Sequence, residues 1–202
     1  MKALILAADG FEDSELLVPY YRLREEDVEV EIVAPAPGTI RGEHGYKVEA
    51  TRSVADVRPG EYDLLIVPGG RAAETLSGDR AALRIAEWFL EQRKLTAAIC
   101  HGPLVLVETG LMEDRQATCH PSIAYALQSA HAHYLNRPVV VDDHLVTSRG
   151  PADLPEFMRE VMKIVHRERE ARADAPTTSA SSVMASAAGW RIQGPGAPGA
   201  AS

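Results

Sequence analysis

Short apolar runs alternate along the chain with longer segments in which apolar residues recur at helical spacing. The mainly apolar runs are Ala3–Ala7, Val28–Val33, Leu64–Val67 and Thr96–Ile99. Runs of this length are typical of strands covered on both faces of a parallel sheet. Alternation of such strands with helices predicts an α/β fold with a doubly wound, three-layer arrangement.

Three segments show helical patterns between and after these strands. The first is Ser14–Glu25, and the second is Ala81–Gln92, which follows Asp79 as an expected N-terminal cap. The last helix is expected to open with the carboxylate of Asp153 as its cap and to place the apolar residues of Leu154–Val165 on one face.

Two further segments are expected to form hairpins. Gly38–Thr51 contains glycines at positions 38, 42 and 45, and 139–147 has apolar residues on both sides of a polar Asp-Asp-His turn. From residue 173 the composition changes to mostly Ala, Gly, Ser, Thr and Pro, with too little large apolar surface to offset the entropy of ordering. We therefore expect one domain over residues 1–172 and a disordered tail over 173–202.

Composition and charge limit the classes of function. The 202 residues include 21 Lys and Arg against 29 Asp and Glu, a net charge of −8, which argues against nucleic acid or an anionic membrane as the partner. No apolar run approaches the roughly 18 residues of a membrane span, and Asp9 ends the first run too early for a signal peptide. Two cysteines cannot form a disulfide framework and fit a reducing cytoplasm.

The most informative segment is the one around Cys100. An apolar strand ends there, Gly102 permits an unusual or crowded backbone, and Pro103 suits the first turn of a following helix. Strand, sharp turn and helix form the layout of a nucleophile elbow. A helix N-terminus and the adjacent His101 both favour the thiolate, so we expect a reactive thiol rather than an inert, buried one.

Two other turns are expected at the same edge of the sheet. Leu64–Val67 leads into Gly69 and Gly70, whose backbone N–H groups can face a developing oxyanion. Glu12 follows the first strand and lies one position too early for a simple dipole partner of the next helix, so its carboxyl is expected to reach into the crevice.

Metal and nucleotide sites have little support. The dipeptides Cys100-His101 and Cys119-His120 do not match the usual spacing of zinc ligands. Neither a GxGxxG motif nor a Walker-type loop occurs. We therefore expect no metal and no nucleotide.

Four blocks in order resemble the PfpI-type intracellular cysteine proteases of the ThiJ/PfpI superfamily, which shares its scaffold with class I glutamine amidotransferase domains. The blocks are Phe11–Leu16, Pro68–Ala72, Ala98–Pro103 and Ser148–Pro155. The resemblance extends from about Lys2 to Val165 and implies a flavodoxin-like fold with a mainly parallel sheet. It also implies a cofactor-free enzyme and a homo-oligomer, dimer or hexamer, whose active site is shared between subunits.

The resemblance also assigns roles to individual residues. Cys100 matches the nucleophile, His101 its partner, and Glu74 the acid that completes a triad from a neighbouring subunit. Glu12 matches the carboxyl that hydrogen-bonds the sulfur, and the N–H groups of Gly70 and His101 match the oxyanion hole.

Other positions bear on the substrate. Phe11 and His120 are expected at the substrate pocket. His120 stands where close relatives often carry an aromatic hydroxyl, and Cys119 adds a second thiol beside it. These departures leave the expected triad intact and put the substrate preference in question.

These observations favour a cytoplasmic, stress-related cysteine hydrolase acting on the carbonyl of a peptide or small molecule. Peptidase, deglycase and cofactor-free glyoxalase chemistry share the attack of Cys100 on a carbonyl carbon, and the sequence does not choose among them. A second hypothesis is a redox-sensing protein in which Cys100 is oxidised rather than turned over. A third, a purely structural domain, requires an inert Cys100.

Overall fold

The computed structural model describes residues 1–174 and residue 194. Almost all of the tail expected over residues 173–202 therefore lies outside the described residues. The last helix runs to Ala173, one position past the domain boundary expected at residue 172.

A seven-stranded sheet forms the centre of the molecule, in the order β10-β11-β7-β6-β1-β2-β5. Neighbouring strands are parallel except for the edge pair β10 and β11. Its strands are β1 (Lys2–Leu6), β2 (Glu29–Ala34), β5 (Arg52–Ser53), β6 (Leu64–Val67), β7 (Leu95–Ile99), β10 (Val139–Asp142) and β11 (Leu145–Ser148). The four expected strand runs are thus confirmed, with ends that differ by at most one residue.

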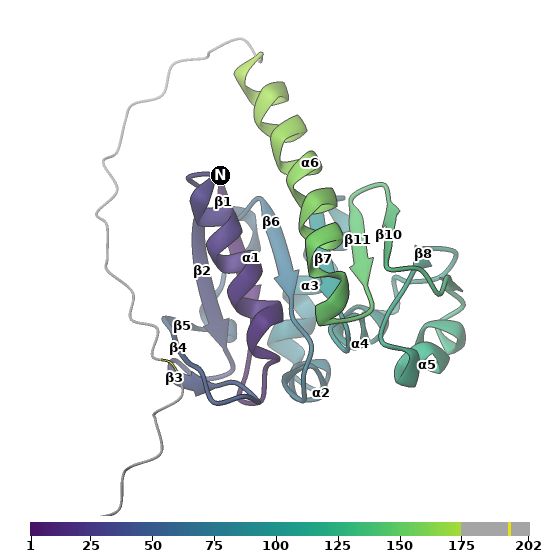
Figure 1. The fold of residues 1–202 in the computed structure, drawn as a ribbon, viewed down its shortest axis with the longest axis horizontal. Coiled ribbons are helices and arrows are strands. Elements are labelled where there is room, and N and C mark those ends of the chain that lie inside the picture. The colour runs from purple at the N-terminus through teal and green to yellow at the C-terminus, as the bar shows by residue number, and fades with distance from the viewer. Residues whose placement is uncertain (175–193, 195–202) are drawn as a thin grey trace, which may run out of the picture.

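Helices cover both faces of this sheet (Figure 1). The α-helices are α1 (Asp13–Glu25), α2 (Ala72–Ser77), α3 (Arg80–Glu91), α4 (Pro103–Val107), α5 (Ala124–Ser129) and α6 (Leu154–Ala173). Short 3-10 turns are η1 (Val54–Asp56), η2 (Pro59–Glu61), η3 (Pro121–Ile123) and η4 (Pro151–Asp153). Helices α1 and α6 pack on each other over one face, while α3 contacts β6, β7 and α4 on the other. The mainly parallel, three-layer α/β fold is as predicted.

The core lies between these layers. Strands β6 and β7 are buried at every position, and β1 is buried from Ala3 onward, as expected for strands covered on both faces. On α6 the buried residues recur at helical spacing and face the sheet.

Both expected hairpins are present. Strands β3 (Gly38–Arg41) and β4 (Lys47–Ala50) form a separate antiparallel pair, and β10 pairs with β11. A small parallel pair, β8 (Gln116–Ala117) with β9 (His133–Tyr134), was not expected, because each strand has only two residues.

The two expected helix caps differ in outcome. The Asp79 carboxylate accepts hydrogen bonds from the N–H groups of Ala81 at 2.7 Å and Ala82 at 3.1 Å, which confirms it as the cap of α3. The expectation for Asp153 is wrong, because its side chain caps no N–H group of α6. Its carboxylate instead binds the guanidinium of Arg149, at 2.9 and 3.2 Å.

Candidate active site

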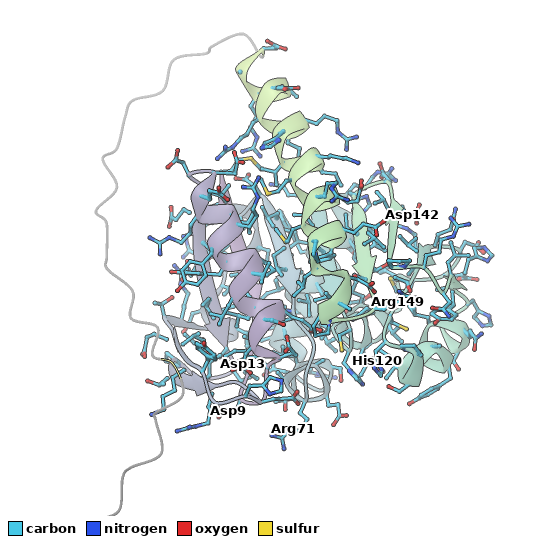
Figure 2. All side chains as sticks on the ribbon, in the orientation of Figure 1. Asp9, Asp13, Arg71, His120, Asp142 and Arg149 are labelled. Carbon is cyan, nitrogen blue, oxygen red and sulfur yellow. The ribbon has the colours of Figure 1, made fainter. Side chains whose placement is uncertain are left out.

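The chemistry-bearing side chains gather where β1, β6 and β7 end. The loops after these strands carry Glu12, Gly70 and Cys100, which line one cleft of about 160 Å³. Parallel strands bring their carboxyl ends to the same edge of a sheet, which explains why residues so distant in sequence meet there. Arg71, which also lines the cleft, lies at this end of the molecule in Figure 2.

Cys100 occupies a strained turn between β7 and α4. Its φ angle is +62°, in the left-handed region that non-glycine residues rarely adopt. Gly102 allows the turn, because a Cβ atom there would collide with the carbonyl oxygen of Val67 on the neighbouring strand. The turn has the strand-to-helix geometry of a nucleophile elbow.

Three groups of the chain surround the sulfur. His101 Nδ1 lies 3.2 Å from Cys100 Sγ. The backbone N–H groups of Gly70 and His101 act as hydrogen-bond donors to Cys100 and lower the thiol pKa. Both N–H groups expected to form the oxyanion hole are therefore next to the Cys100 sulfur.

The environment of the thiol differs from the sequence expectation. Burial, followed by the charge of Glu15, raises the pKa of Cys100 to about 12, against the lowering by the two N–H groups. Helix α4 has only five residues, so its dipole contributes little. The thiol therefore depends on its immediate partners, rather than on a helix dipole, to lose its proton.

Glu15 is the carboxyl group beside the sulfur. Its side chain is fully buried on α1, and its Oε2 accepts a hydrogen bond of 2.7 Å from the N–H of Gly69. Its Oε1 has no hydrogen-bond partner among the described residues, and the Cys100 thiol is close enough to the carboxyl to influence its pKa. Burial raises the pKa of Glu15 to about 8, so the carboxyl is mostly protonated at neutral pH, and its charge opposes the thiolate only above that range.

No hydrogen bond joins Glu12 to the Cys100 sulfur among the described residues, and the carboxyl that influences the thiol is that of Glu15. Glu12 is the N-terminal cap of α1, and its carboxylate accepts hydrogen bonds from the Glu15 N–H at 2.7 Å and the Ser14 hydroxyl at 2.6 Å. It borders the cleft but is held by the helix end. Glu15 lies three positions after Glu12, so both residues are on the same face of α1. One turn into the helix, this face is turned toward the protein interior.

His101 is joined to a second histidine through a hydroxyl. Ser122 Oγ lies 3.2 Å from His101 Nε2 and 2.7 Å from His120 Nδ1. The two imidazoles stack with centroids 4.9 Å apart and an interplanar angle of 21°. Burial, followed by the nearby charge of His120, lowers the pKa of His101, so the neutral base form is favoured.

Glu74 lies on α2, is exposed and lines the same cleft. No hydrogen bond joins it to His101 within the described part of this chain. Its carboxylate nevertheless acts on His101, whose pKa it raises, as does that of Glu43. Glu43 accepts a hydrogen bond of 3.0 Å from the N–H of Arg71, so these two residues close the far wall of the cleft.

Of the two residues expected at the substrate pocket, only His120 adjoins the site. Phe11 is fully buried in the core, and only its backbone takes part, through bridges to Gly42 and Gly70. The assignment of Phe11 to the substrate pocket is therefore wrong, because its ring packs in the core and does not line the cleft.

Cys119 is a second buried thiol without the partners of the first. Its side chain is fully buried, and burial alone raises its pKa to about 12. Among the residues that the structure describes, burial is the only influence on this thiol, and it opposes the thiolate.

Sequence reasoning missed Glu15, Ser122, Glu43 and Arg71. Glu15 lies within the recognised block Phe11–Leu16, and its helical spacing from Glu12 was the available signal. Arg71 lies within the block Pro68–Ala72, directly after Gly70. Glu43 and Ser122 come from other segments, whose approach to the site depends on tertiary structure.

Two findings concern metals and membranes. No group of three or more His, Cys, Asp or Glu side chains among the described residues is placed to hold a metal ion. In the same part of the chain, no helix combines the length and the apolar character that crossing a bilayer requires.

Residues 1–164 match the model of the DJ-1/PfpI family. The chain belongs to the DJ-1/PfpI family. It is 42% identical over 165 residues to deglycase PH1704 of Pyrococcus horikoshii and 41% identical to deglycase PfpI of Pyrococcus furiosus, in each case over 82% of this chain and 99% of the relative.

Solved structures agree with this membership. A two-domain protein of Anabaena variabilis with DJ-1/ThiJ/PfpI-like and ferritin-like domains has a TM-score of 0.81 at 32% identity, covering 82% of this chain and 50% of that one. DJ-1 of Schizosaccharomyces pombe has a TM-score of 0.75 at 26% identity, covering 82% and 92%. The resemblance read from the four sequence blocks is confirmed.

Proposed function

We propose that this chain is a cofactor-free cysteine hydrolase of the PfpI type, acting as a deglycase on carbonyl adducts of amines. The observation that carries the proposal is the arrangement at Cys100, where a base atom lies 3.2 Å from the sulfur and the backbone N–H groups of Gly70 and His101 lower the thiol pKa. The names of the relatives as deglycases favour this activity over peptide hydrolysis and glyoxalase chemistry.

The first chemical step follows from these positions. His101 Nδ1 takes the proton of the Cys100 thiol, and the sulfur forms a bond to the adduct carbon that carries the amine while the bond from that carbon to nitrogen breaks. His101 gives its proton to the leaving amine, and the N–H groups of Gly70 and His101 hold the oxygen on the hemithioacetal carbon that results. Collapse of the hemithioacetal breaks the carbon–sulfur bond, releases the carbonyl compound and returns the hydroxyl proton to the sulfur.

Neutral Glu15 supports this step from the opposite side of the sulfur. Its pKa of about 8 leaves it protonated at neutral pH, so it can donate a hydrogen bond to the thiolate rather than repel it. The same contact favours a second candidate, a redox sensor, because a protonated carboxyl would also stabilise an oxidised, anionic sulfur.

Assembly and location are part of the proposal. We infer a homo-oligomer in which Glu74 of one subunit completes the site of another, in a stress-related role in the cytoplasm. The exposure of Glu74 and its position at the cleft support an intersubunit contact.

A substrate panel tests the proposal. Purified protein is given methylglyoxal-modified amino acids, free methylglyoxal and a chromogenic peptide, with Cys100→Ser as the blank. Cysteine-dependent turnover of the modified amino acids supports the deglycase, and turnover of only one of the other substrates reassigns the reaction. Stoichiometric oxidation of Cys100 by mild peroxide, seen by mass spectrometry without turnover of any substrate, would make the protein a sensor instead.

A further inference from the structure

We propose that the Ser122 hydroxyl joins His101 to His120 in a proton relay that carries the thiol proton away from the sulfur. The inference rests on the proposed role of Cys100 as the nucleophile and extends it. It assigns functions to two residues, Ser122 and His120, that lie outside the expected triad.

The relay is continuous in distance. Cys100 Sγ lies 3.2 Å from His101 Nδ1, and the other nitrogen of that ring lies 3.2 Å from Ser122 Oγ. Ser122 Oγ lies 2.7 Å from His120 Nδ1. The backbone N–H of His120 donates to the carbonyl oxygen of Cys100 at 2.9 Å, so the last residue of the relay is bound directly to the elbow.

One backbone amide sets the direction of every hydrogen bond in this chain. The N–H of Ser122 lies 3.3 Å from His120 Nδ1, and because an amide nitrogen only donates, this Nδ1 must be an unprotonated acceptor. The Ser122 hydroxyl, 2.7 Å from the same nitrogen, must then donate to it as well. Its oxygen is left to accept from His101 Nε2–H.

The tautomer of His101 follows. A neutral imidazole protonated at Nε2 has a free lone pair at Nδ1, the atom that faces Cys100. The thiol therefore donates to His101, and the ring is set as a base. The backbone N–H of Ser122 therefore determines which nitrogen of His101 carries the proton.

The proton balance of the relay is simple. The thiol proton passes to His101 Nδ1, the Nε2 proton passes to Ser122 Oγ, and the hydroxyl proton passes to His120 Nδ1. The products are a thiolate, a neutral His101 in its other tautomer and an imidazolium at His120, with no oxidant or reductant involved. His101 then presents an N–H to the thiolate, which stabilises it.

Protonation of His120 from solvent would block this path. His120 Nδ1 would become a donor, Ser122 Oγ would reverse its hydrogen bond, and His101 Nε2 would have to accept. The thiol would then face an N–H rather than a base. A working relay therefore requires both histidines to have lost their protons before the thiol ionises, so acid suppresses the reactive state through two groups instead of one.

Other charged groups at the site are common to every variant that tests this idea. Glu15 faces the thiol, and Glu43 and Glu74 act on His101. Glu12 and Arg71 also line the cleft. These groups are present in the parent and in every variant, so only a difference between profiles reports on the relay.

The test measures the alkylation rate of Cys100 by iodoacetamide against pH, in full-length protein with Cys119→Ala so that one thiol remains. On the acid side, the slope of log rate against pH should be one unit steeper in this parent than in His120→Asn. An asparagine at this position still accepts from the Ser122 N–H and hydroxyl through its amide oxygen, but it does not carry a proton. It is therefore matched in structure and defective only in the relay.

Ser122→Ala provides the second arm. It should lose the same unit of slope and react about three- to tenfold more slowly at neutral pH, the worth of one hydrogen bond. Circular dichroism melting establishes whether each variant is folded. If Ser122→Ala is not folded, the slope of His120→Asn against that of the parent tests the relay. Equal slopes in parent and variants would overturn the relay.

Failure of the relay and failure of the proposed function give different results. Alkylation needs no turnover, so the slopes are measured whether or not any substrate is processed. Equal slopes with cysteine-dependent turnover would remove the relay and leave the enzyme. A slope difference without turnover on the substrate panel would keep the relay and remove the deglycase.

Discussion

Glu15 and Gly69, 54 positions apart in the chain, are joined by a hydrogen bond of 2.7 Å at the base of the cleft. A Cβ atom on Gly69 would lie 2.7 Å from both Glu15 Oε2 and Cys100 Cβ, so the glycine permits this contact. The bond ties α1 to the turn that carries the Gly70 N–H, and it places a buried acid beside the sulfur.

Replacing Glu15 with Gln should change how stability depends on pH. The pKa of Glu15 is raised from 4.5 to about 8, mainly by burial, so between these values the folded state holds a proton that the unfolded state has released. The free energy of unfolding of the wild type should therefore fall as pH rises through this range. Each pKa unit corresponds to about 1.4 kcal/mol, so the advantage of Glu15→Gln should grow by a few kcal/mol between pH 5 and pH 8.

Urea unfolding at the two pH values measures this difference. The glutamine amide oxygen can still accept from the Gly69 N–H, so the packing is retained. Glu25→Gln, an exposed position on the same helix, is the matched control and should follow the wild type. Parallel behaviour of Glu15→Gln and wild type would mean that the Glu15 carboxyl is ionised in the folded protein.

The two cysteines should differ sharply in function. Cys100→Ser should lower turnover by at least about a thousandfold, the order seen when a nucleophile is removed. Cys119→Ala should stay within about twofold of the wild type, because this fully buried thiol has no base or N–H donors arranged around it. Steady-state rates on the substrate turned over by the wild type decide the point, and an inactive Cys119→Ala enzyme would contradict it.

Much of the fold and the turn that carries the proposed nucleophile were predictable from local pattern. Buried parallel strands appear as apolar runs, and the elbow is contiguous in sequence around Cys100 and Gly102. The hydrogen-bonding carboxyl was assigned to Glu12 instead of Glu15, because which residue caps a helix and which faces the core is settled only when the helix packs. The contact between Ser122 and His101 spans 21 positions and no local pattern indicates it.

Gly102→Ala should disturb the elbow. The added Cβ would collide with the carbonyl oxygen of Val67, a backbone atom in the central sheet that has no room to move. Overpacking of this kind costs about 1–3 kcal/mol, and the displaced Cys100 should also lose turnover. Gly78→Ala is the matched control, because its Cβ would lie 3.7 Å from the nearest atom, an ordinary contact. Equal unfolding midpoints for the two variants would contradict the expected clash.

The last prediction concerns the acid at position 74. His101 Nε2 already faces Ser122 Oγ within its own chain, and Glu74 is exposed at the rim of the cleft. A shared site requires that Glu74 acts across a subunit contact, and in a two-fold pair such a contact is reciprocal. Glu74→Gln and Cys100→Ala should each be inactive alone.

Mixing these two variants with subunits free to exchange should restore activity. Each mixed dimer regains one complete site of its two, in which the Cys100 of the Glu74→Gln chain meets the Glu74 of the Cys100→Ala chain. Random pairing makes about half of the dimers mixed, so recovery should reach about a quarter of the wild-type rate. Mass spectrometry of differently labelled chains verifies the exchange. Recovery near zero despite exchange would place the acid within its own chain, and a nearly fully active Glu74→Gln enzyme would show that His101 needs no carboxylate from a neighbouring subunit.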